Sequence, residues 1–163
     1  MAEDFVSMRN IEFLLYEVLD AESLCELPYF SEHDREIFDM VLETGLRLGA
    51  DELFPVLAQM DKEAPTFNAG TVTVAPVVRE LLQACGDGGW IGAHASFELG
   101  GQQLPDTLLT MVRFILGAAN YSASVYPVLT TGAAQLIGSF GSQELIDTYV
   151  PPMFEGQWQG TMA

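Results

Sequence analysis

The chain has 163 residues, with 23 acidic and 6 basic side chains and a formal net charge of −17. A surface this acidic excludes a protein that binds nucleic acid through a basic patch. Hydrophobic residues make up 49% of the chain, which is enough for one core and too much for a disordered acidic tail. We therefore expect one folded domain, or one domain and a fragment of another.

Charge is concentrated in the first third of the chain. Residues 1–63 hold 16 acidic and 4 basic side chains, whereas residues 64–163 hold 7 and 2. The acidic third is interpreted as a solvated face, with a docking surface for a basic partner as the less favoured alternative. From Thr107 to Gln143 the only charged side chain is Arg113, so we expect protein to cover most of this stretch.

The predicted elements of the first part are helical. Apolar residues recur at helical spacing over Ile11–Leu19, which predicts a short helix capped by Asn10. The sequence Ser31-Glu32-His33-Asp34 has the form of an N-terminal capping signal and predicts a long helix that reaches about Met60. A proline late in this helix removes a backbone donor, so we expect a kink near Asp51–Phe54.

The second part is predicted to be helical as well, after a loop over Ala64–Thr73 that is rich in Gly, Pro and Thr. A glycine cluster ends the next helix, and paired prolines end the last one. The predicted helices are Val77 to about Ala84, roughly Pro105–Ala119, Tyr121–Phe140, and a short helix that Pro151-Pro152 breaks after Val150.

Three features of the sequence predict where in the cell the protein works. Cys25 and Cys85 lie far apart, outside any metal-binding or redox spacing, and are expected to be free thiols in a reducing compartment. The acidic start of the chain lacks the basic segment and apolar run of a secretory signal. Arg113, Asn120 and Pro127 interrupt the longest apolar stretch, so no membrane span is expected. The predicted location is the cytoplasm.

Patterns that carry chemistry are few. His33 and His94 lie in different segments without a neighbouring ligand at metal-binding spacing, so each is interpreted as an ordinary surface or cap histidine and no metal site is predicted. The glycine clusters 86–89 and 100–101 lack the spacing of phosphate-binding loops and are interpreted as turns. The residues by themselves therefore indicate a soluble, acidic, mostly helical domain.

A series of motifs extends this interpretation. In chain order they are Gly89-Trp90-x-Gly92, Glu98-x-Gly100-Gly101-Gln102-x-Leu104-Pro105, Tyr126-Pro127-x-Leu129-Thr130-x-Gly132-Ala133, Gly141-Ser142-x-Glu144, Tyr149-x-Pro151-x-Met153 and Gly156-x-Trp158-x-Gly160-Thr161-Met162. In this order and spacing they resemble the N-terminal region of the FAD-dependent acyl-CoA dehydrogenases. The helix predicted near Met8–Leu19 resembles an extension in the branch that includes the methylmercaptopropionyl-CoA dehydrogenases. Gln103 stands where the family usually has glycine, so that loop is expected to differ in shape.

The resemblance implies a fold and a division into domains. The fold is all-α, an orthogonal helical bundle of about five to six helices, with the first residues of a β-domain at the C-terminal end. Residues 1–30 would form an N-terminal extension with one short helix. Residues 31–150 would form the helical domain, and residues 151–163 the truncated start of the β-domain.

The resemblance also implies an activity, the oxidation of an acyl-CoA thioester to the trans-2-enoyl-CoA with FAD as cofactor. It places no catalytic residue in this chain, because the family's catalytic glutamate and most of its flavin site lie in later segments. It assigns Met162 and Ala163 to the flavin edge, and Tyr126, Leu129 and Thr130 to the wall of the acyl pocket. For Tyr126 and Leu129, a role as plain core residues is equally well supported.

Two hypotheses follow for the function. The first is that the chain is the N-terminal portion of such an enzyme, inactive alone. Its expected partners are then an acyl-CoA, an electron-transfer flavoprotein and further copies in a homodimer or homotetramer, as in the family. The alternative is a standalone helical interaction module that kept the domain without its catalysis.

Overall fold

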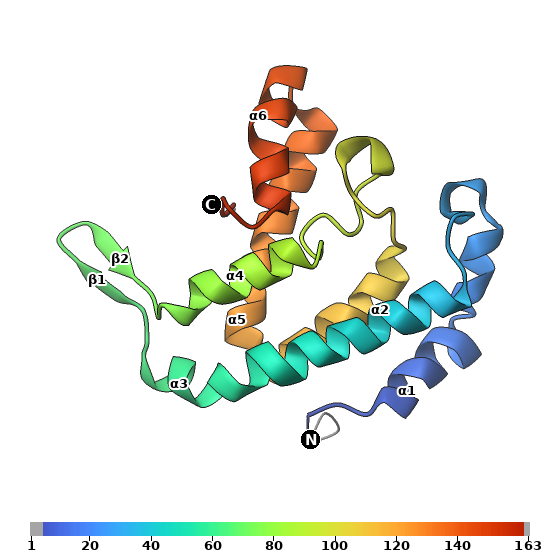
Figure 1. Ribbon diagram of the computed structural model, residues 1–163, viewed down its shortest axis with the longest axis horizontal. Helices are drawn as coiled ribbons and strands as arrows, with labels where there is room; N and C mark the ends of the chain where they lie inside the picture. Colours follow the sequence, from blue (N-terminus) through green and yellow to red (C-terminus); the bar gives the residue numbers. More distant parts are fainter. Residues whose placement is uncertain (1–4, 162–163) are drawn as a thin grey trace.

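The computed structural model describes residues 5–161, which form helices and one small hairpin (Figure 1). Within this range the α-helices are α1 (Met8–Glu12), α2 (Arg35–Leu48), α3 (Leu57–Lys62), α4 (Val77–Asp87), α5 (Asp106–Phe140) and α6 (Gln143–Phe154). The strands are β1 (Thr66–Asn68) and β2 (Thr71–Thr73). The predicted all-α fold with five to six helices is therefore confirmed.

The N-terminal extension begins its helix earlier than predicted. The carbonyl of Ser7 accepts the N–H groups of Asn10 and Ile11, so α1 starts at Met8 and the predicted cap at Asn10 is wrong. A π-helical turn, Phe13–Val18, continues α1, and short 3₁₀ turns cover Ala21–Glu26 and Pro28–Phe30. The apolar spacing identified this helical segment correctly, but it did not determine the first hydrogen bond.

The start of α2 corrects the predicted capping signal. Asp34, not Ser31, is the N-cap, and its carboxylate accepts the N–H of Ile37 at 2.9 Å. The hydroxyl of Ser31 instead donates to the carbonyl of Pro28 at 3.1 Å. The correction follows from the 3₁₀ turn at 28–30, which uses Ser31 to close itself and leaves Asp34 as the first residue able to cap.

The kink predicted in the long helix is confirmed. After α2 the chain forms a π-helical turn, Gly49–Leu53, then a 3₁₀ turn, Phe54–Val56, and then α3. Pro55 has no N–H to donate, so the backbone changes pitch around it instead of ending the helix. As a result α2 and α3 form one long, bent rod along the base of the molecule (Figure 1).

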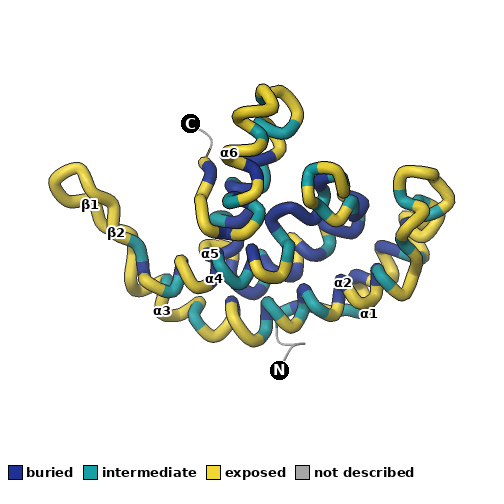
Figure 2. The backbone as a smooth tube through the Cα atoms, turned by 45° about the horizontal axis from the view of Figure 1, so that its top comes forward, coloured by how far each residue is buried: buried dark blue, intermediate teal, exposed yellow. Residues whose placement is uncertain are grey.

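The predicted loop over Ala64–Thr73 is wrong, because it contains the hairpin β1–β2. The strands pair antiparallel with Phe67 opposite Val72. Ala69 and Gly70 both have positive φ, which is the backbone that a tight two-residue hairpin turn requires. All six strand residues are exposed, and the hairpin projects away from the helices (Figure 2). Three-residue strands are too short to show a periodic pattern in the sequence.

The last two helices are long and closely paired. α5 runs from Asp106 to Phe140, with one non-helical residue, Asn120, where the sequence predicted a boundary between two helices. α6 packs against α5 and extends to Phe154, so the break predicted at Pro151 and Pro152 is wrong. Proline keeps a helix-compatible φ and loses only its donor, and the carbonyls of both prolines accept bonds from residues 155–158.

The core lies where α5 crosses the α2 rod and α1. Its fully buried side chains come mainly from α2, the extension and the first half of α5, including Leu15, Phe38, Leu42, Leu108 and Ile115. Among the described residues, α5 is the one helix long and apolar enough to cross a membrane by length and composition. Half of its most apolar window is buried within this fold.

Candidate functional site

Asn120 divides α5 and determines where the candidate site lies. Its backbone is extended (φ −163°, ψ 95°), and its side chain is buried. The amide Nδ2 donates to the carbonyl of Leu53 at 3.1 Å, and Oδ1 accepts the N–H of Ala123 at 3.1 Å. Asn120 therefore ties the bend to the α2 rod and also caps the second half of α5, which carries all three residues predicted to contact substrate.

A groove, here called the Tyr126 groove, lies between the end of α3, the base of the hairpin, the start of α4 and the second half of α5. Its volume is about 390 Å³, which lies within the range of small-molecule sites. Its described lining carries the carboxylates of Asp61 and Glu63 and no basic side chain. The other lining residues are Met60, Ala64, Pro65, Val74, Ala75, Val78, Tyr121, Ser122, Val125 and Tyr126.

The three predicted substrate residues do not line one cavity. Tyr126 lines the Tyr126 groove, and Leu129 is half-buried on the same half of α5. Thr130 is fully buried, and its hydroxyl donates to the carbonyl of Tyr126 at 2.9 Å and accepts the N–H of Gly160 at 3.3 Å. The structure thus places one of the three at a groove, while the substrate role of all three stays a prediction.

A second groove, here called the Thr161 groove, lies between the end of α5, one side of α6 and the segment that follows α6. Its volume is about 650 Å³, and none of its described lining residues is charged. They are Ala133, Leu136, Ile137, Leu145, Tyr149, Met153, Gln159, Gly160 and Thr161. Met162 and Ala163, the predicted cofactor-binding residues, lie outside the described residues.

The resemblance assigns the flavin edge to the residues that directly follow Thr161, so the Thr161 groove is where the fit of an FAD to this chain can be tested. Its apolar lining and the Tyr149 ring fit an aromatic ring system such as isoalloxazine. The described lining offers no cation to balance a pyrophosphate. The residues present therefore fit the ring end of the cofactor, and its phosphates require donors from elsewhere.

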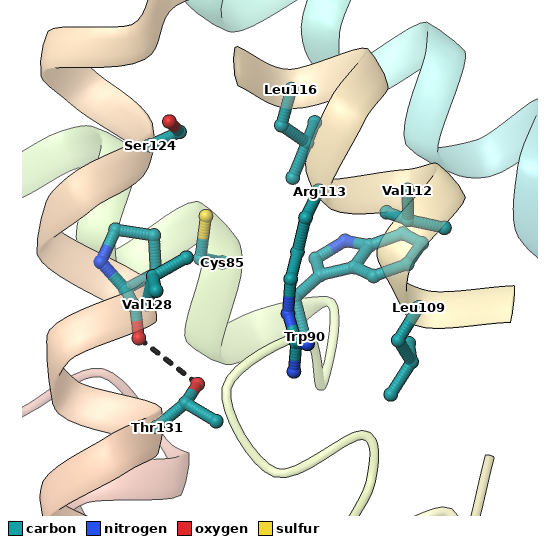
Figure 3. A pocket seen from close by; sticks show the side chains of 10 residues that line it. Cys85, Trp90, Leu109, Val112, Arg113, Leu116, Ser124, Val128 and Thr131 are labelled. Atoms are coloured by element: carbon teal, nitrogen blue, oxygen red, sulfur yellow. Dashed lines mark hydrogen bonds between the residues drawn. The ribbon is translucent and has the colours of Figure 1, made fainter. Parts of the chain in front are cut away.

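A small cavity, partly open to solvent, lies in the angle between the two halves of α5 (Figure 3). Its volume is about 40 Å³, enough for one or two water molecules but not for an acyl chain. Cys85 from α4 and Trp90 from the following loop line it, with Arg113 at its side. Burial raises the pKa of the Cys85 thiol to about 11, so this sulfur stays protonated and is a poor nucleophile near neutral pH.

Other polar groups give no metal site. Within residues 5–161 no three His, Cys, Asp or Glu side chains lie close enough together to bind a metal ion. Nε2 of His33 lies 3.0 Å from the carbonyl oxygen of Gln103. Gln103 has the left-handed φ of 54° that favours glycine, and its side-chain amide donates to the carbonyl of Tyr29. Gln103 thus joins the N-terminal extension, through Tyr29, to the loop before α5, and His33 contacts the same residue.

Sequence reasoning missed the two contacts that organise this region. The sequence predicted a helix boundary at Asn120 but not its side-chain hydrogen bonds, and the contact of Thr130 with Gly160 joins residues 30 positions apart. An isolated Asn at the predicted boundary of two apolar helices was a usable signal for the bend. No local pattern indicates the second contact.

Comparison with known proteins now defines the class. The sequence model of the family "Acyl-CoA dehydrogenase, N-terminal domain" matches residues 35–157, most of the chain. The chain therefore belongs to the family of acyl-CoA dehydrogenase N-terminal domains, as the motifs predicted. The matched range begins at the first residue of α2 and ends after α6, so it excludes the N-terminal extension.

Two curated relatives match almost the whole chain at low identity. One is the 3-methylmercaptopropionyl-CoA dehydrogenase of Ruegeria pomeroyi, 24% identical over 155 residues. Another is the butyryl-CoA dehydrogenase of Syntrophomonas wolfei, 26% identical over 161 residues. Each alignment covers 95% of this chain and 26% of the relative. The chain thus spans about a quarter of the length of these relatives, and at 95% coverage both alignments include most of the N-terminal extension.

Proposed function

We propose that this chain is the N-terminal portion of an FAD-dependent acyl-CoA dehydrogenase that oxidises an acyl-CoA thioester to the trans-2-enoyl-CoA. The family match over residues 35–157 carries the proposal. The names of both relatives and the uncharged Thr161 groove support it. The working protein is proposed to be cytoplasmic, to pass electrons to an electron-transfer flavoprotein and to form a homodimer or homotetramer.

In this proposal the chain contributes walls and no catalytic group. FAD, when bound, supplies an acceptor for the hydrogen that leaves the β-carbon. The Tyr126 groove would take the apolar acyl part of the substrate, since its described lining is mostly apolar. CoA is polyanionic, and a chain with a net charge of −17 repels it, so its phosphates would be bound by other parts of the enzyme.

The test uses the complete gene product that carries residues 1–163. We expect the purified protein to contain flavin, and an acyl-CoA added without oxygen to bleach the visible absorption of that flavin. A panel that includes butyryl-CoA and 3-methylmercaptopropionyl-CoA samples the relatives' named substrates. Flavin that no thioester reduces would contradict the proposal.

A pair of variants tests whether the Tyr126 groove binds the substrate. Tyr126→Ala enlarges the Tyr126 groove, so it should raise the KM for acyl-CoA several-fold. Val128→Ala is the matched control, because Val128 belongs to the same half of α5 but lines the small cavity at the bend. Equal effects of the two substitutions on KM would argue against a substrate role for the groove.

The standalone interaction module remains the competing function. The exposed side chains of Leu136, Phe140, Leu145, Tyr149 and Trp158 on α5, α6 and the following segment are apolar and would suit a protein partner. A gene product that ends near residue 163, binds no flavin and is recovered with a stable protein partner would favour this alternative.

A further inference from the structure

The segment after α6 is held against α4 by close backbone contacts. A Cβ atom at Gly86 would lie 2.3 Å from the carbonyl carbon and oxygen of Glu155, and one at Gly156 would lie 2.5 Å from the carbonyl oxygen of Leu82. Nε2 of Gln83 also donates to the carbonyl of Glu155 at 3.2 Å. These contacts fix the turn at residues 155–156.

From this turn the chain crosses to the second half of α5, where Gly160 is held in two ways. A Cβ atom at Gly160 would lie 2.5 Å from the Cβ of Ala133, so the backbone lies directly on the helix. The N–H of Gly160 donates to Oγ1 of Thr130 at 3.3 Å. Thr130 is 0% exposed, so water does not compete for this bond.

The Thr130 hydroxyl is held in place as well. It donates to the carbonyl of Tyr126 one helical turn earlier, at 2.9 Å, which leaves its lone pairs for the Gly160 N–H. One buried side chain therefore connects the wall of the Tyr126 groove to the backbone beside the Thr161 groove. The next residues along the chain are Thr161 and then the predicted flavin edge, Met162 and Ala163.

We propose that Thr130 is a positioning residue whose hydroxyl holds the Gly160 N–H and so fixes the path of the chain toward the flavin edge. The inference rests on the proposed function, because the resemblance alone assigns Met162 and Ala163 to flavin. It gives Thr130 a role distinct from direct contact with substrate. If this segment were not anchored, it would have to become ordered each time FAD bound, and the lost conformational entropy would weaken binding.

The first measurement is hydrogen exchange in the complete flavoprotein, read on the peptide that contains Gly160. Thr130→Val keeps the shape and removes the acceptor, so exchange at Gly160 should accelerate about tenfold. Thr130→Ser should restore the wild-type rate. Gly160→Ala is a second variant, which displaces the segment from Ala133 while leaving the hydroxyl intact, and it should accelerate exchange similarly.

Thr131→Val is the matched control. Thr131 is the next residue on α5, and its hydroxyl lies 2.9 Å from the carbonyl oxygen of Ile91 and 3.0 Å from that of Pro127, away from Gly160. The substitution has the same chemistry, so it controls for the general loss of a threonine hydroxyl. Exchange at Gly160 should not change in this variant.

The second measurement is flavin affinity and the visible spectrum of the bound flavin in the same proteins. Thr130→Val should weaken FAD binding about tenfold and shift the spectrum, whereas Thr130→Ser and Thr131→Val should match the wild type. If Thr130→Val leaves exchange at Gly160 unchanged, or accelerates it without changing flavin binding, the role given to Thr130 is overturned while the proposed function stands. A wild-type protein that binds no flavin would refute the proposed function and with it the flavin role of Thr130.

Discussion

The two halves of α5 belong to one apolar stretch of sequence but have different surroundings. In the first half, Asp106–Ala119, the buried residues are mostly large aliphatic side chains, Leu108, Leu109, Val112, Ile115 and Leu116. In the second half, 121–140, they are small or polar, namely Ala123, Ser124, Pro127, Thr130 and Ala134. The first half forms the core by side-chain packing, whereas the second lets other backbone approach closely.

This difference shows how one helix serves two purposes. Large side chains bury apolar area and stabilise the fold, and small ones leave room for the segment after α6 and for two grooves. Substitutions should therefore affect stability in the first half and positioning in the second.

The largest expected effect is that of Leu108→Ala. Leu108 is fully buried in the first half of α5, so the substitution should lower the free energy of unfolding by about 3 kcal/mol. Leu136→Ala removes an exposed side chain from the second half and should change it by no more than about 0.5 kcal/mol. Urea denaturation measures both, and equal losses would show that the halves are not distinct.

The next largest effect is expected at the bend itself. Asn120→Ala leaves the carbonyl of Leu53 and the N–H of Ala123 without their partner, which should cost about 2 kcal/mol of unfolding free energy. Asn10→Ala is the control, because Asn10 is exposed and does not cap α1. Urea denaturation measures both variants. Equal changes in the free energy of unfolding for Asn120→Ala and Asn10→Ala would refute the role given to Asn120.

A smaller, stabilising effect is expected at Gly117, in the first half of α5. A Cβ atom there would meet its nearest neighbour at an ordinary 3.7 Å, so Gly117→Ala should raise the free energy of unfolding by about 0.5–1 kcal/mol through helix propensity. In the second half, a Cβ at Gly138 would lie 3.2 Å from Cδ1 of Leu99. Gly138→Ala should therefore raise the free energy of unfolding by less than Gly117→Ala does. Thermal unfolding of both variants measures this, and a larger gain from Gly138→Ala would contradict the prediction.

The smallest effect concerns His94, whose surroundings include Asp106 and Arg113 of the first half. Burial lowers the pKa of His94; Asp106 opposes the shift and Arg113 reinforces it. The unfolded chain therefore binds this proton more readily, and the contribution of His94 to stability falls as the pH drops below about 6.5. Compared with His94→Gln, the wild type should lose more stability between pH 7.5 and pH 5.5. If the free energies of unfolding of the two proteins change with pH in parallel over that range, the effect is excluded.

The sequence by itself determined the helical class, the kink near Pro55 and the division of α5, because apolar spacing and proline chemistry act within a few residues. Motif order also identified the family. The cap of α2 at Asp34 and the hairpin over Thr66–Thr73 are also local, but their sequence signals are too short or too ambiguous to assign. Tertiary structure alone decided that Asn120 bonds to the carbonyl of Leu53 and that Thr130 holds Gly160. These two bonds join residues 67 and 30 positions apart, so they form only once distant segments have packed, and no local pattern encodes them.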